Sequence, residues 1–330
     1  MIIGYNNYIE KAEKRCVQNS RVKFEFDIKR NITIVRGDSA TGKTTLVSLI
    51  DTYDRLGADS GVEVSCSKRC LTVNNSNWES ILNSVSECIV FIDEENTIIK
   101  SDDFARKIKD TNNYYVIITR ENLPNLPYSV EEIYGIHTSG KYADMRRTYN
   151  SFYRLYSVDE QRMADKAETV IVEDSNSGYD FFKAVAADDI NCISAGGKTK
   201  IKRTVMDNEG KNLLVIADGA AFGSEMGELY LYMQKHPEVS LYLPESFEWL
   251  ILKSDLIDGN RIADILQHTE DFLESSEYFS WERFYTKLLI SETEGTYLQY
   301  SKQKLNDVYL NPNEKEAVLT VADIIRENIT

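Results

Sequence analysis

ITIVRGDSATGKTT, residues 32–45, is the stretch that decides the fold of the first half of this chain. Its β-branched start, Ile32–Val35, predicts a buried strand, and from Lys43 onward leucine and isoleucine recur at helical spacing. Between them, residues 37–44 fit the pattern G-x-x-x-x-G-K-[ST]. Glycines let the backbone turn tightly, so that successive N–H groups and the helix start point at one anion. The stretch therefore predicts a phosphate-binding loop between a strand and a helix.

The residue types in this loop suit a nucleoside triphosphate with its metal. Lys43 would place its charge on the β- and γ-phosphates, and Thr44 would direct its hydroxyl at Mg²⁺. The alternative, a glycine-containing surface turn, does not account for the flanking strand and helix. The predicted nucleotide-binding set is Gly37, Asp38, Ser39, Ala40, Thr41, Gly42, Lys43, Thr44 and Thr45.

Acidic residues follow a second apolar run. The sequence CIVFI, residues 88–92, predicts a buried strand and is followed directly by Asp93 and Glu94. We expect Asp93 to bind Mg²⁺ and Glu94 to polarise the attacking water, so that hydrolysis is favoured over binding alone. The alternative is a strand that ends in a solvated acidic turn.

A third predicted strand, YYVII at 114–118, has Thr119 and Arg120 at its carboxyl end. Ligands of open α/β sheets gather at the carboxyl ends of the strands. Either residue could therefore contact the γ-phosphate, and the alternative is a structural strand cap. The predicted catalytic set is Lys43, Asp93, Glu94 and Arg120.

Residues 22–122 resemble the P-loop NTPases, with Walker A at Gly37–Thr44, Walker B at Asp93 and Glu94, and a sensor-like third strand. The resemblance implies a parallel sheet with helices on both faces, ATP and Mg²⁺ as cofactors, and a homo-oligomer that completes its sites across subunits. The chain contains neither an LSGGQ-like signature nor an N-K-x-D motif that reads guanine. Adenine and an AAA- or STAND-like type are therefore favoured.

The rest of the chain predicts a second module. A polar segment at 138–160 indicates a domain boundary, after which apolar runs again alternate with helical segments, the pattern of a parallel α/β sheet. The predicted divisions are a P-loop ATPase domain at 1–150, a smaller α/β domain at 151–260 and a helical region at 261–330.

Carboxylates follow the predicted strands of this second domain. Glu173 and Asp174 come after TVIV, Asp218 follows LLVIA, and Glu245 stands just beyond a third strand. Carboxyl ends of parallel strands share one rim, and clustered carboxylate oxygens suit Mg²⁺ or Mn²⁺, which could activate water against a phosphodiester. The predicted metal ligands of the chain are Thr44, Asp93, Glu173, Asp174 and Asp218.

Residues 168–257 resemble a Toprim domain, the fold shared by topoisomerases, primases and the nucleases of the overcoming-lysogenization-defect family. That pattern has a Glu after one strand and Asp-x-Asp after a later one. Glu173 matches the first element, but Asp218-Gly219-Ala220 keeps only the first Asp. Asp174 or Glu245 could substitute for the missing second one. The resemblance implies nucleic-acid processing controlled by the ATPase, in phage defence or mobile-element biology.

Two other functions remain open. The missing second Asp is compatible with a nucleotide-gated switch whose Toprim-like domain is inactive. A small-molecule phosphotransferase would use the same loop, but neither an Arg-rich lid nor an acceptor site is identifiable.

Composition limits the partners. The net charge of −15, from 38 Lys and Arg against 53 Asp and Glu, excludes a generally basic nucleic-acid-coating protein. A local basic segment, GGKTKIKR at 196–203, could contact DNA or RNA, and its alternative is a solvated loop and helix start. The tyrosine-rich C-terminal region would pack helices or face a protein partner.

The cysteine count and hydropathy indicate the compartment. Five cysteines, an odd number, suit a reducing cytoplasm, and no apolar run reaches the ~18 residues of a membrane span. We therefore expect a cytoplasmic protein without a membrane partner. Cys66-x-x-x-Cys70 has no second ligand pair close in sequence, so zinc is not expected there.

Overall fold

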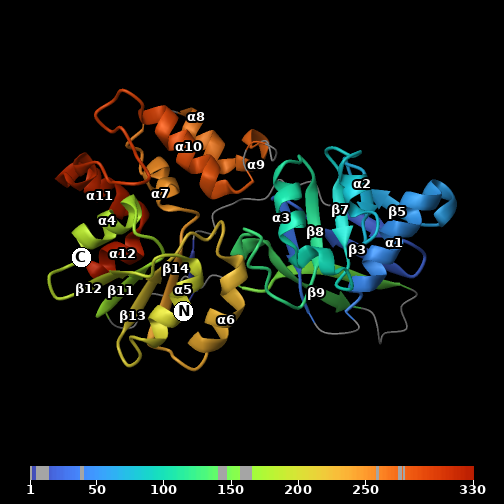
Figure 1. Ribbon diagram of the computed structural model, residues 1–330, viewed down its shortest axis with the longest axis horizontal. Helices are drawn as coiled ribbons and strands as arrows, with labels where there is room; N and C mark the ends of the chain where they lie inside the picture. The colour runs from blue at the N-terminus through green and yellow to red at the C-terminus, as the bar shows by residue number, and fades with distance from the viewer. Residues whose placement is uncertain are drawn as a thin grey trace. The chain divides into compact units, whose positions relative to one another are not determined.

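The computed structural model describes residues 2–4, 15–37, 41–139, 147–156, 166–257, 260–273, 277 and 279–330. The chain is a mixed α/β protein that divides into two compact units (Figure 1). The first unit is Ile9–Tyr156 with Glu274–Phe279. The second unit is Met1–Tyr8 with Ser157–Leu273 and Ser280–Thr330.

The first unit contains a sheet with the strand order β5-β2-β3-β10-β9-β4-β8-β7-β6. The run from β9 to β6 is parallel throughout, whereas β2 pairs antiparallel with both β3 and β5. The strand β10 is antiparallel to β9 and parallel to β3. The strands are β2 (Arg15–Gln18), β3 (Val22–Phe26), β4 (Ile32–Val35), β5 (Glu63–Ser65), β6 (Cys70–Thr72), β7 (Ile89–Ile92), β8 (Tyr114–Ile118), β9 (Ile133–Ser139) and β10 (Thr148–Arg154).

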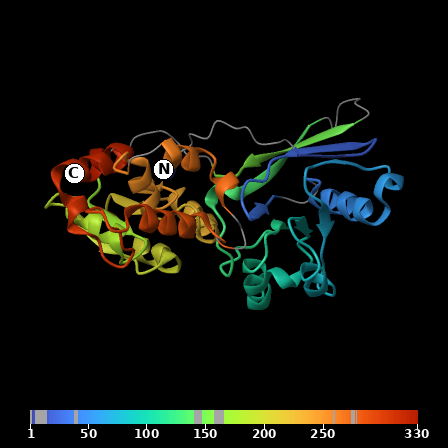
Figure 2. The ribbon, with the colours of Figure 1, turned by 90° about the horizontal axis from the view of Figure 1, so that it is seen from above.

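Helices cover both faces of the parallel part of this sheet. Leu46 and Ile50 of α1 (Lys43–Leu56) lie in one buried cluster with Val35 of β4 and Phe24 of β3, so the sheet curls around this helix (Figure 2). Each such fully buried side chain contributes about 1.5–3 kcal/mol. On the other face, the ring of Phe104 contacts the ring of Tyr115, a residue of β8, edge-on. The shorter helices are α2 (Trp78–Leu82) and α3 (Asp102–Lys109), with 3-10 turns η1 (Gly57–Ser60), η2 (Thr97–Lys100) and η3 (Val130–Glu132).

The second unit is built on a parallel sheet in the order β1-β14-β13-β11-β12. Every residue of β11, β13 and β14 is buried, as expected for a sheet covered on both faces. In Figure 1, α5 and α6 lie on one side of the sheet, and α4 and α12 lie on the other. The strands are β1 (Ile2–Gly4), β11 (Thr169–Val172), β12 (Asn191–Ser194), β13 (Leu213–Ile216) and β14 (Val239–Leu243).

The helices of the second unit include the whole C-terminal region. They are α4 (Ser177–Val185), α5 (Lys198–Met206), α6 (Gly223–Met233), α7 (Phe247–Lys253), α8 (Asn260–Gln267), α9 (Thr269–Phe272), α10 (Trp281–Thr293), η4 (Asp307–Leu310), α11 (Pro312–Val321) and α12 (Asp323–Ile329). The helix α7 packs against both α10 and α11. The helical character predicted for 261–330 is thus present, but these helices belong to the same compact unit as the second sheet.

The division into units also differs from the predicted ranges at two places. Ile2–Gly4 falls within the range 1–150 but pairs with Leu241–Leu243 of the second sheet. The predicted boundary segment, 138–160, contains all of β10, a strand of the first unit. The first unit is therefore inserted after the first strand of the second.

Glu132 is a buried acid beside the strand that precedes the candidate loop. Its side chain is 1% exposed, and its Oε2 accepts a hydrogen bond from Thr33 Oγ1 of β4 at 3.2 Å. Burial raises the pKa of Glu132 to about 7 from 4.5, and the nearby charge of Arg30 offsets only part of that effect. The protonated side chain therefore stabilises the fold, and this contribution is complete below pH 4.5 and is lost as the pH rises through about 7.

We expect Glu132→Gln to remove this pH dependence. Between pH 5 and pH 8 the variant should gain about 1–3 kcal/mol of unfolding free energy relative to the wild type, measured by denaturant unfolding at both pH values. Arg30 keeps an acidic neighbour in the variant, because Glu131 lies 3.7 Å from its guanidinium. The exposed Glu121 supplies the matched control Glu121→Gln, and an equal gain in both variants would contradict the prediction.

Candidate functional site

The candidate phosphate loop joins β4 to α1, in the strand–loop–helix arrangement that the sequence predicts. Gly37 and Gly42 adopt φ values of 136° and 89°, in the region that favours glycine. A Cβ atom on Gly42 would also stand 3.3 Å from Phe24 Cζ. Both the backbone conformation and this close contact therefore disfavour a larger residue at position 42. Asp38, Ser39 and Ala40 lie outside the described residues, and the loop is therefore described at Gly37 and from Thr41 to Thr45.

Lys43 spans this loop. Its side chain is buried, and its Nζ donates to the Gly37 carbonyl at 2.7 Å and to Thr41 Oγ1 at 3.1 Å. Thr44 and Thr45 are exposed in the first turn of α1, which contains no acidic residue. The amino end of this helix thus combines its partial positive charge with the lysine ammonium, an arrangement that favours an anion.

The other predicted residues of this site meet the loop at one edge of the sheet. The strand β8 lies between β4 and β7, and all three run parallel. Their carboxyl ends therefore bring Gly37, Asp93 and Arg120 to the same edge. Burial raises the pKa of Asp93, while the Glu94 N–H, which donates to Asp93 Oδ1 at 2.8 Å, and the charge of Lys43 lower it.

Arg120 contacts Glu94 directly, a pairing that the sequence analysis did not predict. Arg120 Nε lies 3.0 Å from Glu94 Oε2, and its Nη2 lies 3.3 Å from Oε1, so the contact is bidentate. The two side chains are 53% and 31% exposed, and such pairs contribute at most about 1 kcal/mol. The arginine can therefore exchange this carboxylate for another anion at little cost.

Thr119 fits the alternative role of a strand cap. It is buried, and its Oγ1 accepts a hydrogen bond from the Glu121 N–H at 3.0 Å. Of the two residues considered for phosphate contact, Arg120 is therefore the candidate that the geometry favours.

Oxygen donors at this edge suit a hard cation. A hydroxyl from Thr44 and a carboxylate from Asp93 are ligand types that Mg²⁺ prefers, usually together with water and phosphate oxygens. Asp93 is half-buried and accepts the backbone N–H of Glu94 on one oxygen, which fixes its orientation. These residues fit the predicted ion, whose binding here stays a prediction.

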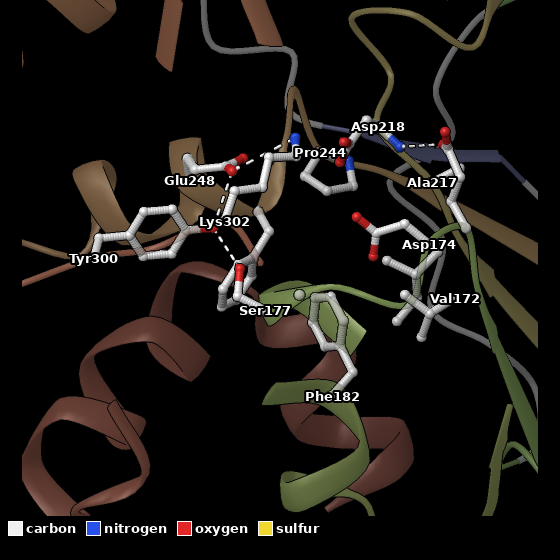
Figure 3. A pocket seen from close by; sticks show the side chains of 14 residues that line it. Val172, Asp174, Ser177, Phe182, Ala217, Asp218, Pro244, Glu248, Tyr300 and Lys302 are labelled. Atoms are coloured by element: carbon white, nitrogen blue, oxygen red, sulfur yellow. Dashed lines mark hydrogen bonds and ion pairs between the residues drawn. The ribbon is translucent and has the colours of Figure 1, made fainter. Parts of the chain in front are cut away.

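The second unit has a small pocket at the carboxyl ends of its central strands (Figure 3). Glu173 and Asp174 line it from the end of β11, and Asp218 lines it from the end of β13. Glu173 Oε2 accepts the N–H of Asp218 at 3.1 Å. Burial raises the pKa of Glu173 to about 7 and also raises that of Asp218, where nearby Glu282 adds to the effect.

A lysine from the C-terminal region lies among these carboxylates. Lys302 Nζ is 2.6 Å from Glu282 Oε1 and 3.6 Å from Glu248 Oε1, and Figure 3 shows the ammonium between Glu248 and Asp218. Burial opposes the charge on Lys302, but these three carboxylates raise its pKa. The ammonium thus balances part of the negative charge of these carboxylates.

A tyrosine completes the pocket. The Tyr300 hydroxyl donates to Glu248 Oε1 at 2.9 Å and lies 2.5 Å from Ser177 Oγ. Sequence reasoning missed Glu248, Glu282, Tyr300 and Lys302 because none of them directly follows a strand. They come from α7, from α10 and from the segment after it, and a lone Lys or Glu in such positions carries no motif.

The carboxylates predicted to bind a second metal all line this pocket, but the structure does not gather them into one ligand group. Within the part of the chain that the structure describes, no group of three His, Cys, Asp or Glu side chains is placed to hold a metal ion. Asp174 points into the pocket but accepts hydrogen bonds from the backbone N–H and side-chain Nδ2 of Asn176 at 3.2 and 2.8 Å. Glu245, the considered substitute, is buried and is not among the residues that line the pocket. Metal binding by Glu173, Asp174 and Asp218 remains a prediction that this geometry does not favour.

Three of the four basic side chains in the segment at 196–203 form polar contacts within the second unit. Lys198 Nζ donates to the Ala221 carbonyl at 3.0 Å, and burial lowers its pKa. Lys202 binds Glu228 at 2.7 Å, and Arg203 lies 3.8 Å from Asp207. Contact with DNA or RNA through this segment stays a prediction. The contacts within the unit leave fewer of its basic side chains available for a phosphate than the sequence suggested.

Comparison of this chain with protein-family models and with curated proteins yields no match. Among the described residues, no helix combines the length and the apolar character needed to cross a membrane.

Proposed function

We propose that this chain binds ATP with Mg²⁺ and hydrolyses it at the carboxyl edge of the first sheet. The proposal rests on one observation. The glycine-lysine loop, the Asp93–Glu94 pair and Arg120 follow the adjacent parallel strands β4, β7 and β8 and so share one edge. This edge unites positive charge for phosphates, oxygen ligands for a hard cation and a carboxylate for water.

Each residue has a distinct role in this proposal. The Lys43 ammonium exchanges the Gly37 carbonyl and Thr41 hydroxyl for phosphate oxygens. Glu94 accepts a proton from the attacking water as that water bonds to the γ-phosphorus, and the bond to the ADP oxygen breaks. Arg120 orients Glu94 through their ion pair and would share its charge with the γ-phosphate. Mg²⁺ on Thr44 and Asp93 would neutralise phosphate charge.

The test is titration of the purified chain with ATP, ADP and GTP in Mg²⁺ by calorimetry, combined with phosphate release. We expect ATP and ADP to bind, GTP to bind more weakly, and ATP to yield ADP and free phosphate. A folded chain that binds neither adenine nucleotide would overturn the proposal. Transfer of the γ-label to a small molecule instead of water would support the phosphotransferase alternative.

For the second unit, we propose a nucleotide-gated switch without nuclease activity, which depends on the ATP site above. Two observations favour it over metal-dependent nucleic-acid processing. Ala220 stands where the Toprim pattern has its second Asp, and the Lys302 ammonium lies between Glu248 and Glu282. A homo-oligomer, a protein partner and a role in phage defence or mobile-element biology remain predictions from the resemblance.

We expect no cleavage of single- or double-stranded DNA or RNA by the wild type in Mg²⁺ or Mn²⁺ above the level of Glu173→Gln and Asp218→Asn. Wild-type cleavage that falls at least tenfold in both acidic-residue variants would instead support the nuclease.

Lys302→Met should lower the unfolding free energy by about 1–3 kcal/mol, because it leaves Glu248 and Glu282 without this cation. The exposed Lys304 provides the matched control Lys304→Met.

A further inference from the structure

Arg36 lies between the buried strand β4 and the first glycine of the candidate phosphate loop. Val35 pairs with Ile118 of β8, so Arg36 stands beside the residues that directly follow β8. Its backbone N–H donates to the Tyr134 carbonyl at 2.7 Å, which continues the pairing of β4 with β9. A lone arginine in front of the glycine pattern belongs to no motif, so only the structure draws attention to this residue.

The guanidinium of Arg36 binds the segment that carries Arg120. Its Nη2 donates to Asn122 Oδ1 at 2.8 Å, to the Tyr128 hydroxyl at 3.1 Å and to the Glu121 carbonyl at 3.4 Å. All three acceptors are neutral groups, and all three belong to the chain after β8. The side chain of Arg36 therefore holds the two residues that come directly after Arg120.

This placement leaves one donor of Arg36 unpaired. The side chain is half-buried, and its Nε is buried without a hydrogen-bond partner among the residues that the structure describes. A buried donor without a partner is unfavourable, and native structures contain few of them. The guanidinium thus lies where its Nη2 reaches the segment after β8, and not where all of its donors are paired.

A second contact fixes the same turn from its own strand. Thr119 Oγ1 accepts the Glu121 N–H at 3.0 Å, while Arg36 donates to the carbonyl of the same residue. Arg120 lies between these anchored residues, and its own guanidinium makes the bidentate contact with Glu94. Of the two anchors, only Arg36 belongs to the strand that leads into the candidate phosphate loop.

We propose that Arg36 is a positioning residue for ATP hydrolysis, because it holds the turn from which Arg120 reaches Glu94. This inference rests on the proposed ATPase function of the first unit. Loss of the guanidinium would free residues 121 and 122, and a displacement of about 1 Å at a reacting group can slow catalysis by on the order of 100-fold. ATP would still bind, because the contacts of Lys43 lie within the loop.

The competing explanation is that Arg36 itself contacts the γ-phosphate. Its described side-chain contacts all go to the segment after β8 rather than to the loop, which favours the indirect role. The two explanations differ in a measurable way. A residue that acts through Arg120 has nothing left to position once Arg120 is removed, whereas two independent phosphate contacts contribute separately to the rate.

The test is a double-mutant cycle of Arg36→Met and Arg120→Met in the full-length chain, read by single-turnover phosphate release at saturating ATP and Mg²⁺. We expect Arg36→Met to slow release by roughly 10- to 100-fold. Its affinity for a non-hydrolysable ATP analogue should stay within about threefold of the wild type. The double variant should be within about twofold of Arg120→Met. Single effects that multiply in the double variant would overturn the proposal.

Asn122→Ala provides a second variant that leaves Arg36 in place. It removes the acceptor at 2.8 Å, so it should also slow hydrolysis without weakening analogue binding, and it replaces Arg36→Met in the cycle if circular dichroism shows that variant to be unfolded. Arg106→Met is the matched control, because Arg106 is exposed and pairs with Asp103 within α3. Rates for Arg36→Met and Asn122→Ala within twofold of this control would also overturn the proposal.

The wild type separates this inference from the function on which it rests. A folded wild type that binds no adenine nucleotide, or that releases no phosphate, overturns the ATPase and the role of Arg36 together. A wild type that hydrolyses ATP, combined with multiplying effects in the cycle, overturns the role of Arg36 alone.

Discussion

Lys43→Ala is expected to reduce ATP turnover by at least about 100-fold, equivalent to about 2.7 kcal/mol of transition-state stabilisation. The lysine is the buried cation of the candidate loop, and its ammonium already lies against Gly37 and Thr41, where phosphate oxygens would bind. Negative charge shifts among the phosphate oxygens during transfer, so a fixed ammonium there stabilises the transition state. Phosphate release at saturating ATP and Mg²⁺ measures the effect.

The control for this substitution separates chemistry from folding. Lys107 lies on α3, and its Nζ donates to Asn83 Oδ1, just after α2 and away from the loop. Lys107→Ala should retain wild-type turnover, and the circular dichroism of both variants should match the wild type. Turnover in Lys43→Ala within twofold of Lys107→Ala would remove the loop from the proposed mechanism.

The central strands of both units could be predicted from sequence because their signal is local. Residues 114–118 and 169–172 are rich in apolar and β-branched side chains, and both form largely buried strands over those bounds. The start of α1 at Lys43 was also predictable, because the glycine pattern and the apolar spacing coincide there. In these segments local propensity and burial favour the same structure.

Three strands of the first sheet, β5, β6 and β10, could not be predicted from sequence, for a different reason. The segment 57–80 looks polar, yet it contains β5 and β6, each three residues long. Segments this short show no periodicity, and their structure depends on pairing with β2 and β7, which are distant in sequence. Likewise β10 has polar residues on one side. The ring of its Phe152 stacks on the ring of Phe26, with the ring centroids 4.7 Å apart, and no local sequence pattern indicates this contact.

The candidate sites differ in the same way. The loop and the Asp93–Glu94 pair follow strands and carry a motif, so the sequence alone predicts that they lie at one edge of the sheet. The bond between Arg120 and Glu94 joins side chains from two strands, and Lys302 approaches Glu248 from a segment far along the chain. Charge pairing of this kind is set by tertiary packing, so the sequence could not show that a lysine lies among the carboxylates of the second pocket.

Glu94→Gln is expected to lower ATP hydrolysis by about 10²–10⁴-fold while ATP affinity stays within about threefold of the wild type. The amide keeps the size of the side chain but cannot accept the water proton, and Glu94 is not proposed to bind the phosphates. Its bidentate contact with Arg120 is partly exposed, so the lost ion pair should cost at most about 1 kcal/mol of stability.

The adjacent residue offers a matched control for this loss. Glu95 is exposed and follows Glu94 directly, so Glu95→Gln makes the same chemical change one position further along. It should leave both hydrolysis and affinity near wild-type values. Calorimetry with a non-hydrolysable ATP analogue and single-turnover phosphate release separate binding from chemistry in all three proteins. If Glu94→Gln weakens binding and hydrolysis by the same factor, the carboxylate acts in nucleotide binding, and the proton acceptor must be sought elsewhere at this edge of the sheet.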